Sequence, residues 1–235
     1  MTHFRPHDLI RLPRSHGLTG VGPTPAWVRK SLAVAPWVVV RRTAALPPGT
    51  IAVGVRGPER NLRWGGIIPA SDAMECWTPE TVSKRYLLLS EGRRRMIPAL
   101  TAIRPFTEIL RQYGLVGGPT GSVGFELVSG RPTATVNSDL DAVIQTPQHI
   151  ARDVAQAIMQ AVSQLPVRCD VQLETPGGAI TLAEYAFVDG PIALRGSNGP
   201  HLVRDPWAIT GEKENTDNDE LSLSGSGRPA SWFSA

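Results

Sequence analysis

Two β-branched segments flank a helical repeat in the second half of the chain, and this order constrains the fold more than any other feature. In the central segment, apolar residues recur every three or four positions, at Ile150, Val154, Ile158, Val162 and Leu165. This is the period of an amphipathic helix. Thr146-Pro147 predicts its start, because threonine can cap a helix and proline suits its first position. Strands are predicted on either side, at about residues 133–144 and 167–173. A strand, a helix and a strand in this order are typical of an α/β domain.

The first 85 or so residues show a different pattern, with short β-branched runs between turns. The runs at 37–42 and 51–55 predict two strands, and the Pro/Gly-rich segment between them predicts a turn. The 21 prolines and 23 glycines of the chain also favour short elements over a long helical bundle. We therefore expect a small β-rich N-terminal domain at residues 1–88 and an α/β domain at residues 89–210, an α+β arrangement as a whole.

Two helices are expected before the carboxylate-bearing strand. The first spans about residues 98–113, where Pro105 should kink or divide it and Gly114 is a natural end. The glycine-rich turn at 117–122 precedes the second, a short helix that ends near Gly130. The turn therefore leads directly into a helix N-terminus.

The composition is that of an ordinary globular protein, since 41% of the 235 residues are hydrophobic and 19% are charged. The longest apolar stretch, 32–40, is too short to cross a bilayer, and no apolar run follows a basic start at the N-terminus. We expect a cytoplasmic protein without a membrane partner. Cys76 and Cys169 lack the spacing of a disulfide framework or zinc site, and core or neutral positions are expected for both. Residues 211–235 are polar, acidic and rich in Ser and Gly, which predicts a dispensable disordered tail.

The basic residues are almost all arginine: only three of the 24 are lysine. The planar guanidinium binds phosphate oxygens in a bidentate way, so this bias suits a phosphate-rich ligand. A codon preference for arginine would produce the same bias. The formal net charge of +3 is too small to require nucleic acid as a partner.

The most informative segment is 137–144, which contains Asp139 and Asp141. In a strand these two side chains point to the same face, while Leu140 points to the other. Carboxylates about 6–7 Å apart repel each other by about 2–3 kcal/mol at an effective dielectric near 20. A bound cation would offset this repulsion, and Mg²⁺ favours carboxylate oxygens together with substrate phosphates.

A third carboxylate, Asp170, lies on the polar face of the next predicted strand. If the two strands are neighbours, Asp170 can join Asp139 and Asp141. Three carboxylates can hold two Mg²⁺ ions in the arrangement used for in-line attack at phosphorus. Alone, Asp139 and Asp141 would be better explained as a solvated strand end or turn; the glycine turn, the intervening helix and Asp170 together favour the metal site.

Gly121 and Ser122 offer a phosphate site. A glycine turn that leads into a helix N-terminus presents unpaired backbone N–H groups and a favourable dipole, and Ser122 adds a hydroxyl donor. The alternative is a simple loop between two helices. The segment matches neither the P-loop pattern nor the dinucleotide-binding fingerprint.

Together, Gly-Ser, Asp-x-Asp on a strand and a later Asp resemble the DNA polymerase β-type nucleotidyltransferase superfamily. Longer strings resemble the malonate decarboxylase holo-acyl-carrier-protein synthases, a family also called phosphoribosyl-dephospho-CoA transferases. These strings lie at 7–9, 36–42, 53–57, 119–132, 138–141, 170–176 and 199–207. The resemblance extends over about residues 5–208.

The resemblance implies a fold, a reaction and a partner. The C-terminal domain would be nucleotidyltransferase-like, with a mixed sheet flanked by helices. The enzyme would transfer the phosphoribosyl-dephospho-CoA group from 2′-(5″-triphosphoribosyl)-3′-dephospho-CoA to a serine of the apo acyl-carrier subunit of malonate decarboxylase, releasing pyrophosphate. Asp139 and Asp141 would bind Mg²⁺, and Asp170 would hold a second ion or act as general base. Gly121 and Ser122 would hold the outer phosphates.

Arginines cluster around the two predicted N-terminal strands, at positions 41, 42, 56, 60 and 63, with only Glu59 opposing them. Arg56 and Arg60 are our candidates for binding the substrate phosphates. The cluster could instead dock an acidic carrier protein, or consist of solvated strand ends.

Two other functions remain open on the sequence. The first is a nucleotidyltransferase that acts on another hydroxyl acceptor, on a small molecule or a protein. The second is a non-catalytic carrier-protein-binding module, although a protein without catalysis would have no reason to keep three like charges together.

Overall fold

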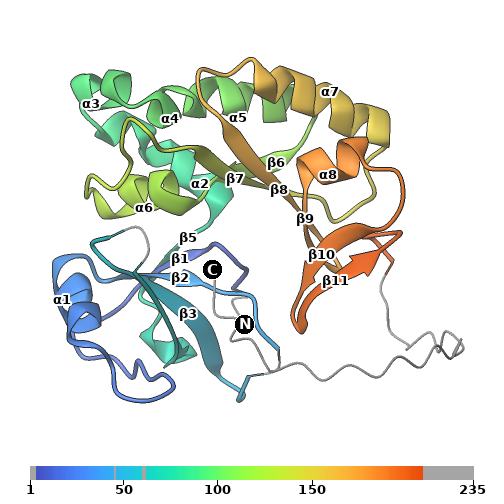
Figure 1. Cartoon of the computed structure of the whole chain (residues 1–235). Coiled ribbons are helices and arrows are strands. Elements are labelled where there is room, and N and C mark those ends of the chain that lie inside the picture. The colour runs from blue at the N-terminus through green and yellow to red at the C-terminus, as the bar shows by residue number, and fades with distance from the viewer. Residues whose placement is uncertain (1–3, 45, 60–61, 209–235) are drawn as a thin grey trace, which may run out of the picture.

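The computed structural model describes residues 4–44, 46–59 and 62–208, and it contains two β-sheets with helices packed around them (Figure 1). The predicted α+β class is therefore confirmed. The predicted tail at 211–235 lies outside the described residues. None of the described helices is both long and apolar enough to cross a membrane.

The N-terminal sheet has five antiparallel strands in the order β4-β3-β2-β1-β5. Their bounds are β1 Leu9–Arg11, β2 Trp37–Val40, β3 Thr50–Arg56, β4 Arg63–Pro69 and β5 Glu75–Trp77. Helix α1 (Ala26–Val34) covers one face, where Val28 and Leu32 share a core with Val38 and Val53. This helix was not predicted. The 3₁₀ turn η1 (Ala70–Asp72) follows β4.

The C-terminal sheet is mixed and has six strands in the order β11-β10-β9-β8-β7-β6. Their bounds are β6 Val116–Pro119, β7 Leu140–Gln145, β8 Cys169–Thr175, β9 Gly178–Thr181, β10 Ile192–Gly196 and β11 Gly199–Val203. Among the described strands, only β7 and β8 pair in parallel, and α7 connects them. The predicted strand–helix–strand unit is this β7-α7-β8 crossover.

Helices fill the space above and beside the six-stranded sheet (Figure 1). Their bounds are α2 Pro79–Val82, η2 Ser83–Leu88, α3 Glu91–Met96, α4 Pro98–Thr101, α5 Ile103–Gln112, α6 Gly121–Ser129, α7 Arg152–Ser163 and α8 Leu182–Phe187. As predicted, the helical segment near Pro105 is divided, but the break falls at Ala102. Because Pro105 has no N–H, the ordinary hydrogen bond across this break cannot form.

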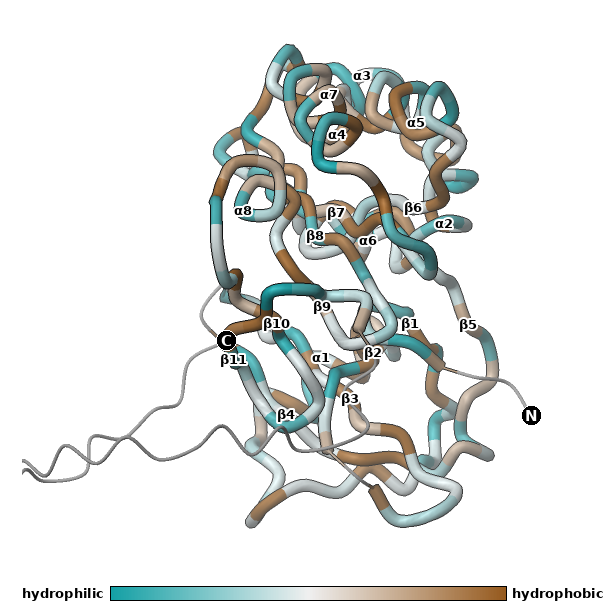
Figure 2. The backbone as a smooth tube through the Cα atoms, turned by 90° about the vertical axis from the view of Figure 1, so that its right-hand side faces the viewer, coloured by the Kyte–Doolittle hydropathy of each residue, from teal (hydrophilic) through white to brown (hydrophobic). Residues whose placement is uncertain are grey.

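The sheet has one apolar face and one polar face. Leu140, Ile144 and Leu173 belong to the same buried cluster as Phe106 of α5 and Ile158 of α7. Figure 2 shows hydrophobic segments along β7 and β8 beneath these helices. Because side chains alternate along strands, the residues between them face the opposite side, toward the N-terminal sheet (Figure 1). The larger core also includes Leu9 and Trp37 of the N-terminal sheet.

Two predicted boundaries were wrong. The strand predicted from residue 133 begins at Leu140, because the backbone N–H groups of Thr133 and Ala134 donate to the Glu126 carboxylate instead of to a strand. Thr146 does not start a helix. Its backbone N–H and its hydroxyl both donate to the Glu174 carbonyl, so Thr146 extends the β7–β8 pairing and α7 begins only at Arg152.

Candidate active site at the start of strands β7 and β8

Asp141 and Asp170 are register partners on the parallel strands β7 and β8. Partners on neighbouring strands are about 4.8 Å apart at the backbone and point to the same face. Asp141 is half-buried and Asp170 is exposed. Two ionised carboxylates at about this separation repel each other by about 3 kcal/mol at an effective dielectric of 20. The sequence predicted that Asp170 would lie beside Asp141 if their two strands were neighbours. The pairing of β7 with β8 confirms this.

Asp139 lies two residues before Asp141, just outside β7. The Leu140 N–H donates to the Arg168 carbonyl at 2.9 Å, which fixes the chain between the two aspartates against the start of β8. Burial raises the pKa of the Cys169 thiol to about 11, and the charge of Asp139 adds to this rise. Leu140 is the register partner of Cys169, so Asp139 lies near the first residue of β8. Cys169 is a protonated thiol at neutral pH.

The carboxylates provide the type of oxygen donor that Mg²⁺ prefers. Within residues 4–44, 46–59 and 62–208, no three His, Cys, Asp or Glu side chains lie close enough together to hold a metal ion by themselves. Because Mg²⁺ commonly takes one or two protein carboxylates and completes its shell with water and substrate phosphate, the Asp141–Asp170 pair fits such an ion. Asp139 is the nearest additional donor along the chain.

The N-terminus of α6 lies directly against Asp141. The Thr120 N–H donates to the Asp141 carbonyl at 2.8 Å, and a Cβ added to Gly121 would lie 2.0 Å from the Asp141 Oδ2. Gly121 also has a φ of 55°, which favours glycine. The side chain of Thr120, the N-cap residue, does not cap this helix, and the N-terminus of a helix favours an anion beside it. The predicted turn, Ser122 and the Asp pair are thus brought together.

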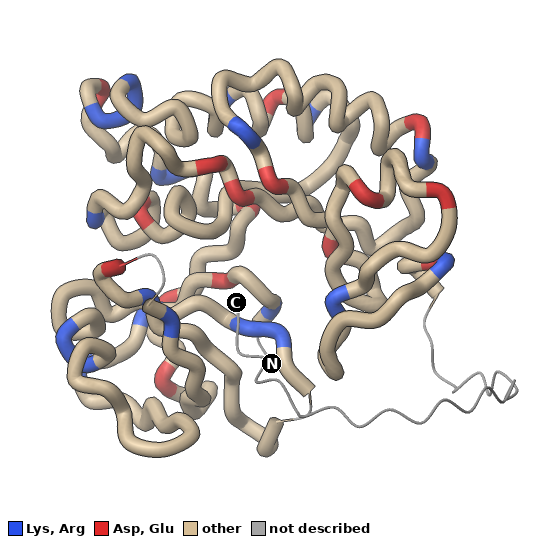
Figure 3. The backbone as a smooth tube through the Cα atoms, in the orientation of Figure 1, with Lys and Arg blue, Asp and Glu red and all other residues tan. Residues whose placement is uncertain are grey.

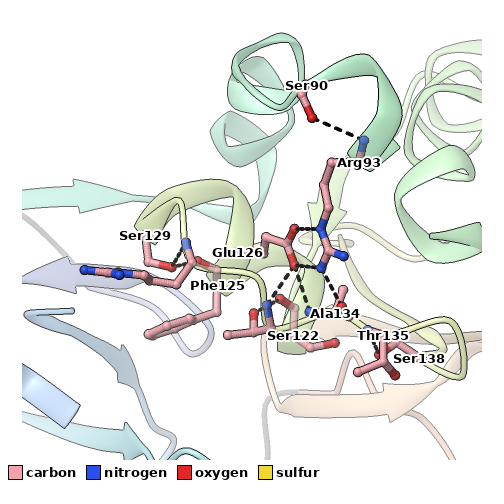
Figure 4. A network of polar contacts seen from close by, with 11 residues as sticks. Ser90, Arg93, Ser122, Phe125, Glu126, Ser129, Ala134, Thr135 and Ser138 are labelled. Carbon is pink, nitrogen blue, oxygen red and sulfur yellow. Dashed lines mark hydrogen bonds and ion pairs between the residues drawn. The ribbon is translucent and has the colours of Figure 1, made fainter. Parts of the chain in front are cut away.

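A buried ion pair supports the loop before β7 (Figure 4). Glu126 of α6 is only 1% exposed, and it accepts hydrogen bonds from Arg93 of α3 and from the backbone N–H groups of Thr133 and Ala134. Hydrogen bonding to Glu126 raises the pKa of Arg93 above its ordinary value. Sequence reasoning missed this network. The available signal was a single acid inside the apolar run at 123–128, because a buried carboxylate requires partners.

The basic candidates belong to the other sheet (Figure 3). Arg56 of β3 is the register partner of Arg63 of β4, and the side chain of Arg41 runs over Gly54 and Gly65 of the same two strands. By strand alternation Arg56, Arg63 and the glycines share one face. Arg60, the other predicted phosphate ligand, lies outside the described residues.

Arg42 is engaged elsewhere. Its Nη2 donates to both carboxylate oxygens of Glu174 on β8, which joins the two sheets. His7 lies close by, and its φ of 73° is unusual for a residue other than glycine. Burial, and then the charges of Arg42 and Arg195, lower the pKa of His7 to about 4. Arg42 is therefore part of a structural contact and not of a solvated arginine cluster.

Paired carboxylates beside the N-terminus of a helix suit a substrate that carries phosphate. Comparison with known proteins places the chain among the transferases. Residues 5–79 match the N-terminal domain, and residues 88–206 the C-terminal domain, of the family described as phosphoribosyl-dephospho-CoA transferase MdcG. The chain belongs to this family, as the sequence resemblance predicted.

Relatives of the same description come from several bacteria. A phosphoribosyl-dephospho-CoA transferase of Pseudomonas aeruginosa is 38% identical over 87% of this chain and 94% of its own length. One of Pseudomonas putida is 39% identical over 87% of this chain and 96% of its own length. One of Klebsiella pneumoniae is 36% identical over 86% of this chain and 96% of its own length. No solved structure matches the chain.

Proposed function

We propose that this transferase moves the phosphoribosyl-dephospho-CoA group from 2′-(5″-triphosphoribosyl)-3′-dephospho-CoA to a serine of the apo acyl-carrier subunit of malonate decarboxylase. The observation that supports this most is the register pairing of Asp141 with Asp170 next to the open N-terminus of α6. A donor that carries a triphosphate needs both a place for its outer phosphates and oxygen ligands for their counter-ion. The two lie side by side here.

Each candidate site residue has a separate role in this proposal. Backbone N–H groups at Gly121 and Ser122 would hold the outer phosphates, because they begin α6 and its N-cap residue Thr120 does not cap it with its side chain. Asp139 and Asp141 would hold Mg²⁺, and Asp170 would hold a second ion or act as the general base. When bound, Mg²⁺ would neutralise the charge of the triphosphate and of the departing pyrophosphate. Arg56 of β3, together with Arg60, is proposed to contact the substrate phosphates.

The reaction would be a displacement at the phosphorus nearest the ribose. The serine Oγ forms the new P–O bond, the bond to pyrophosphate breaks, and the serine proton passes to a base. Asp170 is our candidate for that base, because it is the most exposed of the three aspartates and an acceptor must reach the carboxylates from solvent. The product carries the prosthetic group through a phosphodiester.

The test is mass spectrometry of the apo carrier subunit after incubation with the protein, the triphosphoribosyl donor and Mg²⁺. We expect a mass gain equal to the phosphoribosyl-dephospho-CoA group, abolished by EDTA and reduced at least about 100-fold in Asp139→Asn and Asp141→Asn. Asp153→Asn, an exposed position on α7, is the matched control and should behave as wild type.

Two results would count against the proposal. Near-normal transfer by Asp141→Asn would remove the metal assignment. Efficient transfer of a nucleotide from ATP without any carrier would instead favour a nucleotidyltransferase with another acceptor.

A further inference from the structure

The loop that carries Asp139 is held mainly by one buried carboxylate (Figure 4). Glu126 Oε2 accepts the backbone N–H groups of Thr133 and Ala134, both at 2.8 Å. Arg93 donates to the same carboxylate through Nε at 2.7 Å and Nη2 at 2.9 Å. The Nη2 group also reaches the Ala134 carbonyl at 2.6 Å. Both polar groups of the Ala134 backbone are therefore fixed by this ion pair.

The short segment between Ala134 and Asp139 has little freedom left. The Ser138 N–H donates to the Thr135 carbonyl at 3.0 Å, and the Thr135 N–H donates to the Ser138 hydroxyl at 2.9 Å, so residues 135–138 form a closed turn. The Leu140 N–H is fixed to the carbonyl of Arg168, the residue before β8. Asp139 thus lies between two fixed residues, Ala134 and Leu140, and the Glu126–Arg93 ion pair determines the position of Ala134.

The same helix sets the other half of the site. Gly121, at the start of α6, packs against the Asp141 carboxylate, and Glu126 lies five residues further along. The Thr133 hydroxyl also donates to the Ser122 carbonyl at 2.7 Å, so the loop is tied to the first turn of α6 as well. Helix α6 therefore contacts both Asp141 and the loop at 133–139, and it fixes their positions relative to the turn at 117–122.

A buried ion pair is weak evidence for stability, because an apolar pair of similar volume often stabilises a core as well or better. The surroundings of Glu126 are apolar, with Phe125, Leu127 and Val128 buried in the same cluster. The Glu126 carboxylate is therefore better explained by its hydrogen bonds to Arg93 and to the backbone of the loop than by a contribution to stability. We propose that Glu126 and Arg93 are positioning residues, which fix the Asp139 carboxylate relative to Asp141 through the loop at 133–139. This inference rests on the proposed role of Asp139 as a metal ligand.

The primary test compares Mn²⁺ binding and transfer kinetics in the full-length chain, with Glu126→Gln as the variant. This substitution keeps the side-chain volume but loses the charge that holds Arg93. We expect at least about tenfold weaker Mn²⁺ binding and about 10- to 100-fold lower kcat, with KM for the carrier changed less than about twofold. Glu184→Gln is the matched control, since Glu184 accepts the Ala193 backbone N–H at 2.9 Å in another part of the sheet. It should lose neither Mn²⁺ affinity nor kcat.

A double-variant experiment separates positioning from general stability. If Glu126 acts through Asp139, adding Glu126→Gln to Asp139→Asn should lower Mn²⁺ affinity and kcat no more than about twofold beyond Asp139→Asn alone. A merely structural role would give multiplicative losses and overturn the proposal. Should Glu126→Gln fail to fold, Arg93→Lys replaces it, because lysine keeps the charge but not the planar fork that contacts both Glu126 and Ala134.

The outcomes also distinguish this inference from the proposed function. Wild type that binds no Mn²⁺, or Asp139→Asn that binds it unchanged, defeats the metal assignment itself. If those two measurements behave as expected while Glu126→Gln or Arg93→Lys binds and turns over like wild type, positioning is wrong and the proposed function stands.

Discussion

At the scale of single residues, two separate constraints require glycine at position 121. Its backbone has a positive φ, and its missing side chain leaves the space that the Asp141 carboxylate occupies. The chain also contains Gly114, which has a φ of 65° but whose added Cβ would meet no described atom within 4 Å. Comparing the two positions separates backbone strain from displacement of the carboxylate.

We predict that the left-handed backbone costs Gly121→Ala and Gly114→Ala a similar part of the free energy of unfolding, about 1–2 kcal/mol, and that the contact with Asp141 adds to the loss in Gly121→Ala. Only Gly121→Ala should also lose transfer activity, by about 100-fold, because its methyl group collides with Asp141. Urea denaturation and single-turnover transfer assays provide the two measurements. Equal activity in the two variants would show that Asp141 tolerates displacement.

His7 gives the fold a dependence on pH. Its pKa is about 4 in the folded protein and near 6.5 when the chain is unfolded, so the unfolded state binds the extra proton between these values. The stability contributed by the neutral ring is therefore complete above pH 6.5 and is lost as the pH falls toward 4.

We predict that the free energy of unfolding falls by up to about 1.4 kcal/mol per pH unit within this window on account of His7. The variant His7→Asn should have a flatter profile between about pH 4.5 and 6.5, because asparagine does not titrate there and tolerates a positive φ. Denaturant titrations at several pH values measure both slopes. Parallel profiles would mean that the histidine is solvated and titrates normally.

At the scale of elements, α7 shows how local periodicity produces packing. Ala155, Ile158 and Val162 are buried on one side of this helix, while Gln156 and Gln160 are exposed on the other. Ile158 is fully buried in the core that also contains Leu173 of β8. The helix therefore holds the parallel strands whose ends carry the aspartates.

Ile158→Ala is expected to lower the free energy of unfolding by about 2–5 kcal/mol, because it removes buried methyl groups and leaves a cavity under the sheet. Gln160→Ala, on the exposed side of the same helix, should change it by less than about 0.5 kcal/mol. Chemical denaturation with intrinsic fluorescence detection measures both. A small loss of free energy of unfolding in Ile158→Ala would indicate that the core relaxes to fill the cavity.

At the scale of the whole molecule, the contact between Arg42 and Glu174 joins sheets that are distant in sequence. The side chains are 23% and 12% exposed, so neither charge is well solvated once its partner is removed. The larger core, which includes Trp37 of the N-terminal sheet, crosses the same boundary. The two sheets should therefore unfold together.

We predict that Arg42→Ala destabilises the protein by about 1–3 kcal/mol, because it leaves Glu174 partly buried without its partner. Adding Glu174→Gln should recover part of this loss. Arg111→Ala, which breaks the exposed pair with Glu108, is the control and should leave stability unchanged. Thermal unfolding followed by circular dichroism should show one transition throughout, and strictly additive losses would mean that the pair is not coupled.

Sequence by itself determined the elements whose pattern is local. The apolar period of α7 and the alternation in β8 are visible in the residues, because side-chain direction repeats every 3.6 positions in a helix and every two in a strand. The same alternation predicted that Asp139, Asp141 and Asp170 avoid the core, since a one-residue slip would expose the apolar side chains. Their role in binding metal stays a prediction.

Only the tertiary structure decided where these elements begin and what supports them. Strand β7 starts only at Leu140 because the N–H groups of Thr133 and Ala134 donate to the Glu126 carboxylate. Thr146 belongs to the sheet because its hydroxyl donates to the Glu174 carbonyl. Arg42 is a tie between sheets because a carboxylate 132 positions away accepts its hydrogen bonds. Hydrogen bonds and ion pairs depend on distance in space, so local sequence patterns do not predict partners that are far apart in the sequence.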